Sequence, residues 1–513
     1  MPAAGQQRRE LLVIGAQFTG TFVARELRRK LNVTVVDAKE YFEYTPGILR
    51  AYVKPVHWDT LTFMLEPVLA KRMGVRLIVG EVKALSAEPR EARIRLLADG
   101  QDVALDYDYC VICAGCHFNI APPWGESLWF PTIHEAARLE SAWREIDERY
   151  LEGRRRHILV EHEKIRRLGE RKEKVLVVGA GFIGVEWATE LKYFFPELDI
   201  TIVDFMRRCL GPLPESAATY CSAYMQKAGI QEKYNLRYQP AVRQFWQKVG
   251  MPEKADQNPK EGVFSCQGVQ AANFFMPEET KSKTGPGGGG WILINMKLQV
   301  IQKLSKAGDG SAAAASMEVA AREESEVWGG GRVFAVGDCT FGKVVEPDPS
   351  TGDVERGTKV LLPPVPKICY PGEEQAAHAC RNVLRLAASD ELPPPERQRT
   401  LLMNTWWPWG AGIMSTSLGP KDAVCVIGAN DPDKLRQQPR QSTLSSGSSK
   451  PTPSGSDGAG KMLMTGWKAA IHKDYIETTK CSECQNGLKG RFIWYLVHHT
   501  PINLWGRGPC LVF

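Results

Sequence analysis

The chain has 513 residues, enough for about three domains at the roughly 100–200 residues of a typical domain. Its 65 Lys and Arg residues against 59 Asp and Glu residues leave a net charge of +6 without a long basic block, which argues against a nucleic-acid-binding protein. Hydrophobic residues make up 43% of the chain, a share that excludes a disordered protein. No apolar run reaches the ~18 residues that a membrane-spanning helix needs.

The 13 cysteines are scattered along the chain and do not form the framework of a disulfide-rich protein. This usage favours reduced thiols in a cytosolic compartment. Cys481 and Cys484 form a CxxC pair, but no second pair lies near enough to complete a zinc site, so no metal is expected.

The N-terminal segment has the pattern of one βαβ unit. Residues 11–15 are a short apolar run that ends in glycine, residues 21–31 have a helical composition, and residues 32–37 are a β-branched run that ends in an acid. The same order recurs between residues 174 and 204. The chain is therefore expected to contain two such units.

The second unit has the full pattern of a dinucleotide site: Gly179, Gly181 and Gly184 after a strand, and Asp204 at the end of the next strand. The glycines permit the tight turn, the approach of a pyrophosphate and close helix packing, while the helix N-terminus attracts the phosphates. Asp204 is placed to accept hydrogen bonds from ribose hydroxyls and would repel a 2′-phosphate. This pattern favours NADH over NADPH, although Arg207 and Arg208 lie close by.

The first unit departs from this pattern at its middle position. Gly15 and Gly20 are present, with Asp37 as the acid, but Gln17 stands where the second glycine is expected. A side chain there should crowd the pyrophosphate or form a hydrogen bond with it by a displaced route. The motif alone is therefore weaker evidence for a dinucleotide than the second one.

Between the two units, residues 132–171 form a charged helical stretch. It opens with Thr132-Ile-His-Glu135, which has the spacing of a capping box. The dense charge of this stretch predicts a solvated helix face.

Two later segments complete a known order of motifs. Residues 105–115 predict a strand that runs into Gly115, and residues 334–338 predict a strand that ends in Gly-Asp. The order resembles that of the two-dinucleotide-binding flavoproteins, in which an FAD domain is split by an inserted NAD domain. The resemblance implies an α/β fold with two Rossmann-like domains and a C-terminal α+β cap. It implies that Gly15, Gln17, Gly20, Asp37 and Gly115 bind FAD and that Asp338 holds the ribityl chain.

The branch of this family is indicated by the segment after Asp37, which contains no redox cysteine pair up to Tyr52. Tyr44-Thr-Pro-Gly-Ile-Leu49 looks like the Phe-Thr-Pro-Leu-Leu turn of type II NADH dehydrogenases, and like that of ferroptosis-suppressor and apoptosis-inducing-factor-like proteins. By this resemblance, Thr45 and Pro46 begin a helix that presents its amino end to the isoalloxazine ring.

Two further matches imply the catalytic residues. Gly184-Val-Glu-Trp-Ala-Thr-Glu190 resembles the family's Gly-Val-Glu-x-Ala-x-Glu, which places Glu186 beside the nicotinamide. There Glu186 would hold the nicotinamide amide or relay a proton; a carboxylate that only stabilises a helix N-terminus is the structural alternative. Residues 366–375 fall where the family has a segment under the flavin, and Lys367 would stabilise the reduced ring.

The expected domain boundaries follow from these motifs and from the Gly-, Ser- and Pro-rich stretches. They are residues 1–130 and 266–400 for the split FAD domain with flexible insertions, 131–170 for a charged helical linker, 171–265 for the NAD domain, 401–428 for the start of a C-terminal domain, 429–461 for a disordered linker and 462–513 for a membrane-associated segment.

The last four residues, Cys510-Leu-Val-Phe513, form a C-a-a-X pattern that predicts geranylgeranylation of Cys510. Because one lipid chain holds weakly, a second signal is expected. Residues 489–499, with Leu504 and Trp505, are rich in aromatic residues, and they predict either an interfacial segment or a C-terminal segment docked on the core. The two readings stay open.

Together these features predict an FAD-dependent oxidoreductase that passes a hydride from NADH to flavin and then two electrons to a quinone. The expected location is the cytoplasmic side of a membrane, with mitochondrial association and a homodimer left open. A reductase of a soluble acceptor is one alternative. A non-catalytic NADH-sensing protein that has lost its flavin is another, and Gln17 is the residue that favours it.

Overall fold

The computed structural model describes residues 8–118, 147–257, 261–303 except 284, 325–345 except 343, 359–360, 369–393, 413–427 and 461–499. It divides into two compact units, each assembled from separate stretches of the chain. The first unit comprises Met1–Ala38, Leu65–Cys116 and Gln270–Trp407, and the second comprises Lys39–Met64, His117–Val269 and Pro408–Phe513.

The first unit contains a seven-stranded sheet in the order β18-β8-β1-β2-β5-β6-β7. The strands from β18 to β5 run parallel, and β6 and β7 extend the sheet as an antiparallel pair. The bounds are β1 Glu10–Ile14, β2 Asn32–Asp37, β5 Arg76–Ala87, β6 Arg90–Leu96, β7 Asp102–Asp106, β8 Tyr109–Ile112 and β18 Val333–Ala335. This order of parallel strands, with β1 in the middle, is that of a Rossmann-like sheet.

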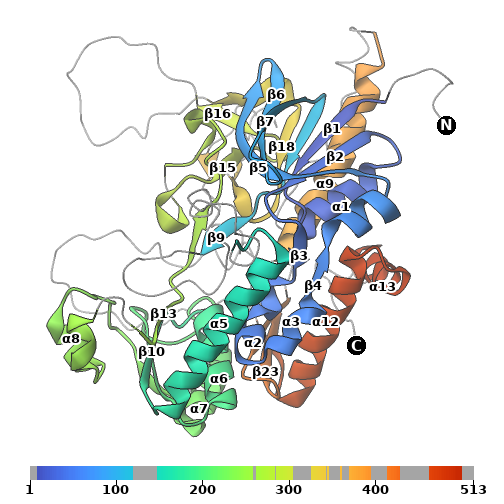
Figure 1. The fold of residues 1–513 in the computed structure, drawn as a ribbon. Helices are drawn as coiled ribbons and strands as arrows, with labels where there is room; N and C mark the ends of the chain where they lie inside the picture. The colour runs from blue at the N-terminus through green and yellow to red at the C-terminus, as the bar shows by residue number, and fades with distance from the viewer. Residues whose placement is uncertain are drawn as a thin grey trace, which may run out of the picture. The chain divides into compact units, whose positions relative to one another are not determined.

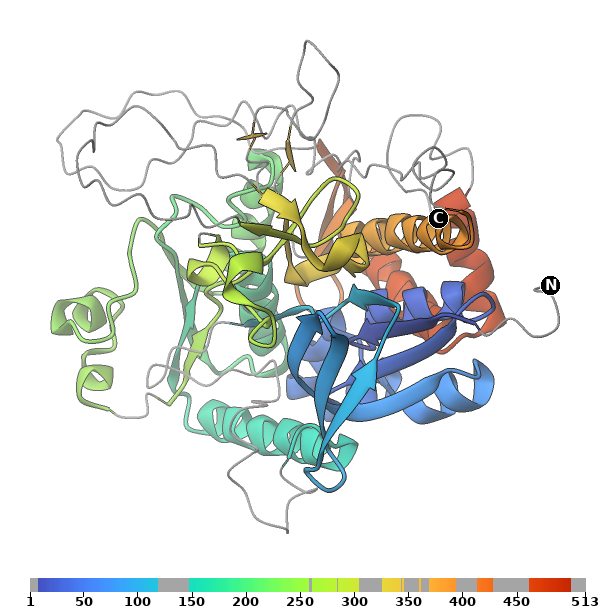
Figure 2. The ribbon, with the colours of Figure 1, turned by 90° about the horizontal axis from the view of Figure 1, so that it is seen from above.

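Helices α1 (Phe18–Leu27) and α9 (Cys369–Asp390) belong to this unit and pack against each other. Both views show them running side by side along the blue strands (Figures 1 and 2). The face of α1 that carries Val23, Ala24 and Leu27 is fully buried. Strand β1 is buried along four of its five residues because helices cover a parallel sheet on its faces.

The remaining strands of the first unit are short. They are β15 Ile292–Ile294, β16 Ile301–Lys303, β17 Ser325–Val327, β19 Thr340–Gly342, β20 Val344–Val345 and β21 Lys359–Val360. Along the chain, β9 (Cys116–Phe118) contains the division after Cys116 and β14 (Val269–Ala271) contains the division after Val269.

The second unit contains a parallel four-stranded sheet in the order β12-β11-β10-β13. Its elements are α5 Leu151–Glu170, β10 Lys174–Val178, α6 Phe182–Phe194, β11 Asp199–Val203, α7 Glu215–Lys227, β12 Gln231–Lys233, α8 Arg243–Lys248 and β13 Val263–Ser265. As in the first unit, the strand that precedes the glycine turn lies in the middle of the sheet. Both predicted βαβ units are confirmed.

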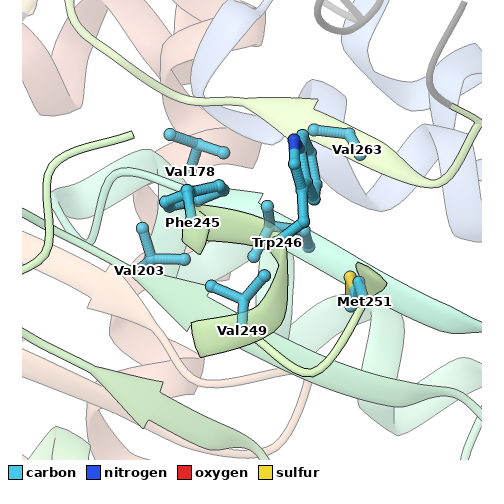
Figure 3. Close-up of a cluster of buried hydrophobic side chains, with 8 residues drawn as sticks. Val178, Val203, Phe245, Trp246, Val249, Met251 and Val263 are labelled. Carbon is cyan, nitrogen blue, oxygen red and sulfur yellow. The ribbon is translucent and has the colours of Figure 1, made fainter. Parts of the chain in front are cut away.

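A hydrophobic core joins this sheet to α8 (Figure 3). Phe245 and Trp246 insert their rings above Val178, Val203 and Val263, and all five side chains are almost completely buried. The indole nitrogen of Trp246 donates to the carbonyl of Pro240 at 2.9 Å, so its one polar atom is satisfied. Side chains of this size contribute about 1.5–3 kcal/mol each when they are fully buried.

The rest of the second unit consists of a hairpin with its helices and a C-terminal α+β arrangement. The hairpin region holds β3 Tyr41–Glu43, η1 Thr45–Gly47, α2 Ile48–Val53, η2 Pro55–His57, α3 Trp58–Leu61 and β4 Thr62–Met64. The C-terminal part holds the antiparallel sheet β22 (Ile413–Ser417), β23 (Ala423–Ile427) and β24 (Lys461–Thr465), followed by α12 (Trp467–Cys484) and α13 (Leu488–His499). None of the described helices is both long enough and apolar enough to cross a membrane.

The prediction that the charged stretch of residues 132–171 has a solvated helix face is only partly right. Helix α5 covers its second half, and the predicted capping box at Thr132 lies outside the described residues. The helix does not expose all of its charge: Arg154 is completely buried. Its guanidinium contacts Glu43, Tyr52 and Glu148, so the charge is compensated inside the unit instead of by water.

Candidate active site

The first glycine turn joins β1 to α1 and closes on its neighbouring strands. The amide of Gly15 donates to the carbonyl of Val36 at 2.7 Å, and the φ of Gly15 is +97°, where a side chain is strained. A Cβ atom at Gly20 would overlap the carbonyl oxygen of Gly15. Glycine at position 20 therefore allows α1 to start directly against the strand.

The second turn, between β10 and α6, has the same construction. The amide of Gly179 donates to the carbonyl of Val203 at 2.8 Å, and the φ of Gly179 is +101°. A Cβ atom at Gly184 would overlap the carbonyl oxygen of Gly179. In both turns, glycine is thus required at the first and third positions for the same steric reasons.

The acid that follows each turn is held in the same way. One carboxylate oxygen of Asp37 accepts the amide of Ala16 at 2.6 Å, and one of Asp204 accepts the amide of Ala180 at 2.6 Å. Each carboxylate therefore lies beside the N-terminus of the helix that follows the glycine turn. This is the arrangement that binds a ribose next to a pyrophosphate in dinucleotide folds.

The middle position separates the two turns. Gly181 has φ −73° and ψ −167°, and Gln17 has φ −81° and ψ −148°, so the backbone requires glycine at neither position. A Cβ atom at Gly181 would meet no atom within 4 Å. At Gln17 the carboxamide nitrogen approaches Asp37 at 3.4 Å. The glutamine is accommodated by the protein and its amide is directed toward the acid.

The late Gly-Asp motif meets the first turn within the first unit. The amide of Gly337 donates to the side-chain carbonyl of Gln375 on α9 at 2.7 Å, and a Cβ atom at Gly337 would lie 3.2 Å from the methyl group of Thr19 on α1. Asp338 follows in the short helix η9 (Gly337–Cys339). Gly115, with φ +69°, follows the neighbouring strand β8. The structure therefore brings Gly115, Asp338 and the first turn to the carboxyl ends of adjacent parallel strands, where such sheets bind ligands.

The Thr45-Pro46 turn belongs to the second unit and is anchored by a buried ion pair. Arg154 donates to both carboxylate oxygens of Glu43, at 2.8 and 3.0 Å, and neither side chain is more than 2% exposed. Burial opposes ionisation of Glu43, but the Arg154 guanidinium outweighs it and lowers the pKa of that carboxyl. Glu43 lies two residues before Thr45, so this pair fixes the start of η1.

Glu186 lies in the second turn of α6 and is held by groups far away in the sequence. Its Oε1 atom accepts the amide of Ser417 at 2.8 Å and also the ammonium group of Lys473 on α12. Glu190, one turn later, is paired with Arg50 on α2 at 2.9 and 3.2 Å. Sequence reasoning missed Lys473 and Arg50 as partners, because no local motif links residues 287 and 140 positions away from their acids.

The second unit contains a small cavity beside Glu186 and Glu190. It is lined by Pro46, Gly47, Leu49, Arg50, His57, Glu186, Glu190, Ser417, Lys473, Asp474 and Glu477. Pro46 and Glu186, which belong to two separate sequence motifs, therefore line one cavity. Two other predicted site residues, Lys367 and Cys510, lie outside the described residues.

The surroundings of Asp204 bear on the choice of coenzyme. Its second oxygen accepts the amide of Met206 at 2.8 Å, so the carboxylate is fixed at the end of β11. The guanidinium of Arg208 donates to four backbone carbonyls of the loop after it, the shortest bond being to Leu213 at 2.7 Å. The guanidinium of Arg208 thus binds the loop and not a 2′-phosphate. The side chain of Arg207 is exposed.

The residues present fit two dinucleotides. Each turn combines closely packed glycines, a helix N-terminus and a fixed carboxylate. The open space beside Gly181 is where a dinucleotide fold binds the pyrophosphate. The first turn fits FAD by the same geometry, with Gln17 as its single departure.

Comparison with known proteins agrees with this geometry. Residues 9–324 match the family described as pyridine nucleotide-disulphide oxidoreductase. Apoptosis-inducing factor homolog B of Dictyostelium discoideum is 23% identical over 341 residues, which cover 65% of this chain and 75% of that protein. A type II NADH:quinone oxidoreductase of Staphylococcus haemolyticus is 22% identical over 247 residues, which cover 44% of this chain and 57% of that protein. The chain thus spans little more than half the length of the latter relative.

Solved structures show the same fold. Sulfide:quinone oxidoreductase of Aquifex aeolicus has a TM-score of 0.58 at 14% identity and covers 93% of this chain and 92% of that one. NDH2 of Plasmodium falciparum in complex with NADH has a TM-score of 0.52 at 12% identity, with 82% and 90% covered. At these identities the likeness concerns the fold alone.

The family match covers more than half of the chain, so the protein belongs to the pyridine nucleotide-disulphide oxidoreductase family. It is an FAD-dependent NAD(P)H oxidoreductase. The fixed carboxylate of Asp204 and the hydrogen bonds of Arg208 to its own loop agree with NADH as the co-substrate. The predicted fold class, enzyme class and cofactors are thereby confirmed.

Proposed function

Because the chain belongs to this family, we propose that it is a non-pumping NADH:quinone oxidoreductase that works at a membrane surface. The observation that carries the proposal is the pair of equivalent glycine turns, each with its acid bonded to the turn amide at 2.6 Å. Relatives named as type II NADH:quinone oxidoreductases support quinone as the acceptor. Bound FAD supplies two-electron transfer from a nicotinamide to an acceptor.

The chain's own residues divide the binding work between the two turns. Gly179, Gly181, Gly184 and Asp204 hold NADH by its pyrophosphate and ribose. In the first unit the FAD is held by Gly15, Gln17, Gly20, Asp37, Gly115 and Asp338. By the family resemblance, Thr45 and Pro46 would contribute to binding of the flavin ring, and Lys367 would stabilise that ring when it is reduced.

Glu186 is proposed to act at the nicotinamide or at the acceptor. Ser417 and Lys473 both donate to its Oε1 atom, and no described residue donates to its Oε2 atom. Its side chain is 12% exposed. The carboxylate is therefore oriented by one oxygen while the other stays available to a nicotinamide amide or to a proton.

The C-terminal helices support the membrane surface. Leu488, Phe492 and Tyr495 on α13 are 58–83% exposed and lie on one helical face, as their spacing of four and three residues requires. On the opposite side Trp494 is buried, and the ammonium group of Lys480 lies 3.6 Å from its ring centroid. This arrangement supports both readings of the segment, one face docked on the protein and the other free for lipid.

Prenylation of Cys510 would supply a second membrane signal beside this helix. The proposed location is the cytoplasmic face of a membrane, that of a mitochondrion included. A protein that reduces a soluble acceptor would have no need for an exposed apolar helix face beside a lipidation signal.

The test is an anaerobic titration of the purified holoenzyme. The proposal expects flavin bands in the visible spectrum, their bleaching by NADH, and their return when a short-chain quinone is added. A colourless protein that takes up no FAD would refute the flavoenzyme. Bleaching by NADH without reoxidation by quinone would refute the acceptor and favour a soluble one.

Membrane attachment is tested separately by fractionation of cells that express the wild type, Cys510→Ser, or Phe492→Asp. Each variant should move from the pellet to the supernatant. An unchanged distribution of Cys510→Ser removes the lipid anchor, and an unchanged distribution of Phe492→Asp removes the interfacial helix.

A further inference from the structure

Two carboxylates on α6 face the same cavity in the same way. Glu186 and Glu190 are four residues apart, which places them on one face of the helix. Each is held through its Oε1 atom by a cation from another segment, Lys473 for the first and Arg50 for the second. The Oε2 atoms have no donor among the described residues. Two carboxylates that line one cavity therefore each keep one oxygen without a donor.

Glu190 is the more constrained of the two. It is 2% exposed, and its Oε2 atom is buried without a hydrogen-bond partner. An ionised oxygen in that position would lose its hydration without compensation, which is costly. A proton on the carboxyl lowers this cost because a neutral group loses less hydration on burial than a charged one. Burial raises the pKa of the Glu190 carboxyl, although Arg50 and Lys473 oppose it.

The other charged and titratable groups around Glu190 also leave the cavity rich in acid. From the packed elements they are Arg50 on α2, His57 on η2, Lys473, Asp474 and Glu477 on α12, with the phenol of Tyr224 on α7. Asp474 accepts from Arg50 at 3.2 Å and Glu477 pairs with His57 at 3.2 Å. The carboxylates outnumber the permanent cations, and like charges in one site favour protonation of one of them.

The proposed reaction needs such a proton. NADH gives up a hydride, which is two electrons and one proton. A quinone that becomes a hydroquinone takes two electrons and two protons. One further proton must therefore reach the acceptor from the protein or from water in every turnover.

We propose that Glu190 is the proton reservoir of the enzyme and that it delivers this proton through Glu186. The O–H bond of Glu190 breaks, a new O–H bond forms on the reduced acceptor by way of Glu186, and the Glu190 carboxylate is then reprotonated from solvent. Both side chains line a cavity with room for about one water molecule, and that water would carry the proton between the two carboxyl groups. Arg50 is the positioning residue that keeps Glu190 turned toward the cavity. The inference rests on the proposed function.

The experiment compares two acceptors in stopped flow with holoenzyme reduced by NADH. A short-chain quinone takes protons with its electrons, and ferricyanide takes electrons alone. In Glu190→Gln the ratio of the quinone rate to the ferricyanide rate should fall at least about tenfold, since a positioned acid contributes about 10²–10⁴. Glu197→Gln, an exposed glutamate after the same helix, is the control and should keep the wild-type ratio.

The pH profile separates proton delivery from a purely structural role. The wild-type quinone rate should decrease as the pH rises above the raised pKa of Glu190, and this decrease should be absent in Glu190→Gln. If that variant does not fold, Glu190→Asp keeps an ionisable group and should move the pH at which the rate falls. A ratio and a pH profile equal to the wild type overturn the inference, while a wild type that does not reduce quinone overturns the proposed function instead.

Discussion

The buried ion pair ahead of the Thr45-Pro46 turn gives a prediction with a matched control on the same helix. Arg154 is 0% exposed and bonds Glu43 through two atoms, whereas the next residue, Arg155, is 53% exposed and bonds Asp59, itself 50% exposed. Arg154→Met leaves the Glu43 carboxylate buried without its partner, which costs about 3–5 kcal/mol. Arg155→Met removes an exposed pair, which is worth about 0–1 kcal/mol.

The measurement is the midpoint of urea unfolding, followed by far-ultraviolet circular dichroism. Because a lower midpoint at unchanged slope reports a loss of stability, the two variants can be compared directly. The double variant Glu43→Gln/Arg154→Met should recover part of the loss, since the uncompensated charge is gone. Equal effects of Arg154→Met and Arg155→Met would refute the reasoning, as would a double variant less stable than Arg154→Met alone.

The same pair predicts a dependence on pH. The pKa of Glu43 is lowered in the folded protein, despite its burial, because of Arg154. The stability that this carboxyl contributes is therefore fully present above its unfolded pKa and is lost as the pH falls through the folded pKa. The difference in midpoint between the wild type and Arg154→Met should be largest near neutral pH and should shrink in acid.

Three further outcomes follow from the sites. Asp204→Ser should raise the ratio of NADPH to NADH use by at least about tenfold in kcat/KM, because the charge that repels a 2′-phosphate is removed; an unchanged ratio would contradict that role. Gly184→Ala should lower the unfolding midpoint because its methyl group overlaps the carbonyl of Gly179, whereas Gly181→Ala should leave the midpoint near the wild-type value and weaken NADH binding in a fluorescence titration. Phe492→Asp should reduce cosedimentation with anionic vesicles, and equal binding would exclude α13 as the contact surface.

The local motifs were predictable because their atoms lie close together in the sequence. Gly15 and Gly20, or Gly179 and Gly184, touch within five residues, and Asp37 and Asp204 reach their turn amides across one helix and one strand. A pattern of glycine, helix and acid therefore carries nearly all the information that the turn needs. The same holds for the central parallel strands β1, β2, β8, β18, β10 and β11, whose apolar runs identify them as buried.

The sequence pattern did not show which charged side chains are buried. The density of charge in the stretch that contains Arg154 predicts a solvated face, because most arginines on a charged helix are exposed. Arg154 is instead buried by its partner Glu43, 111 residues earlier, and the sequence gives no sign of that pairing. Nor does it set Arg154 apart from Arg155, which follows directly and is exposed.

By itself the sequence determined the two dinucleotide turns and the order of the motifs, because those depend on backbone geometry over a few residues. Only the tertiary structure decided which acids are paired and which oxygen stays open. Glu190 obtains Arg50 from 140 residues away and Glu186 obtains Lys473 from 287 residues away. The burial and the partners of an ionisable group depend on distances in space, and chain folding sets those distances independently of separation along the sequence.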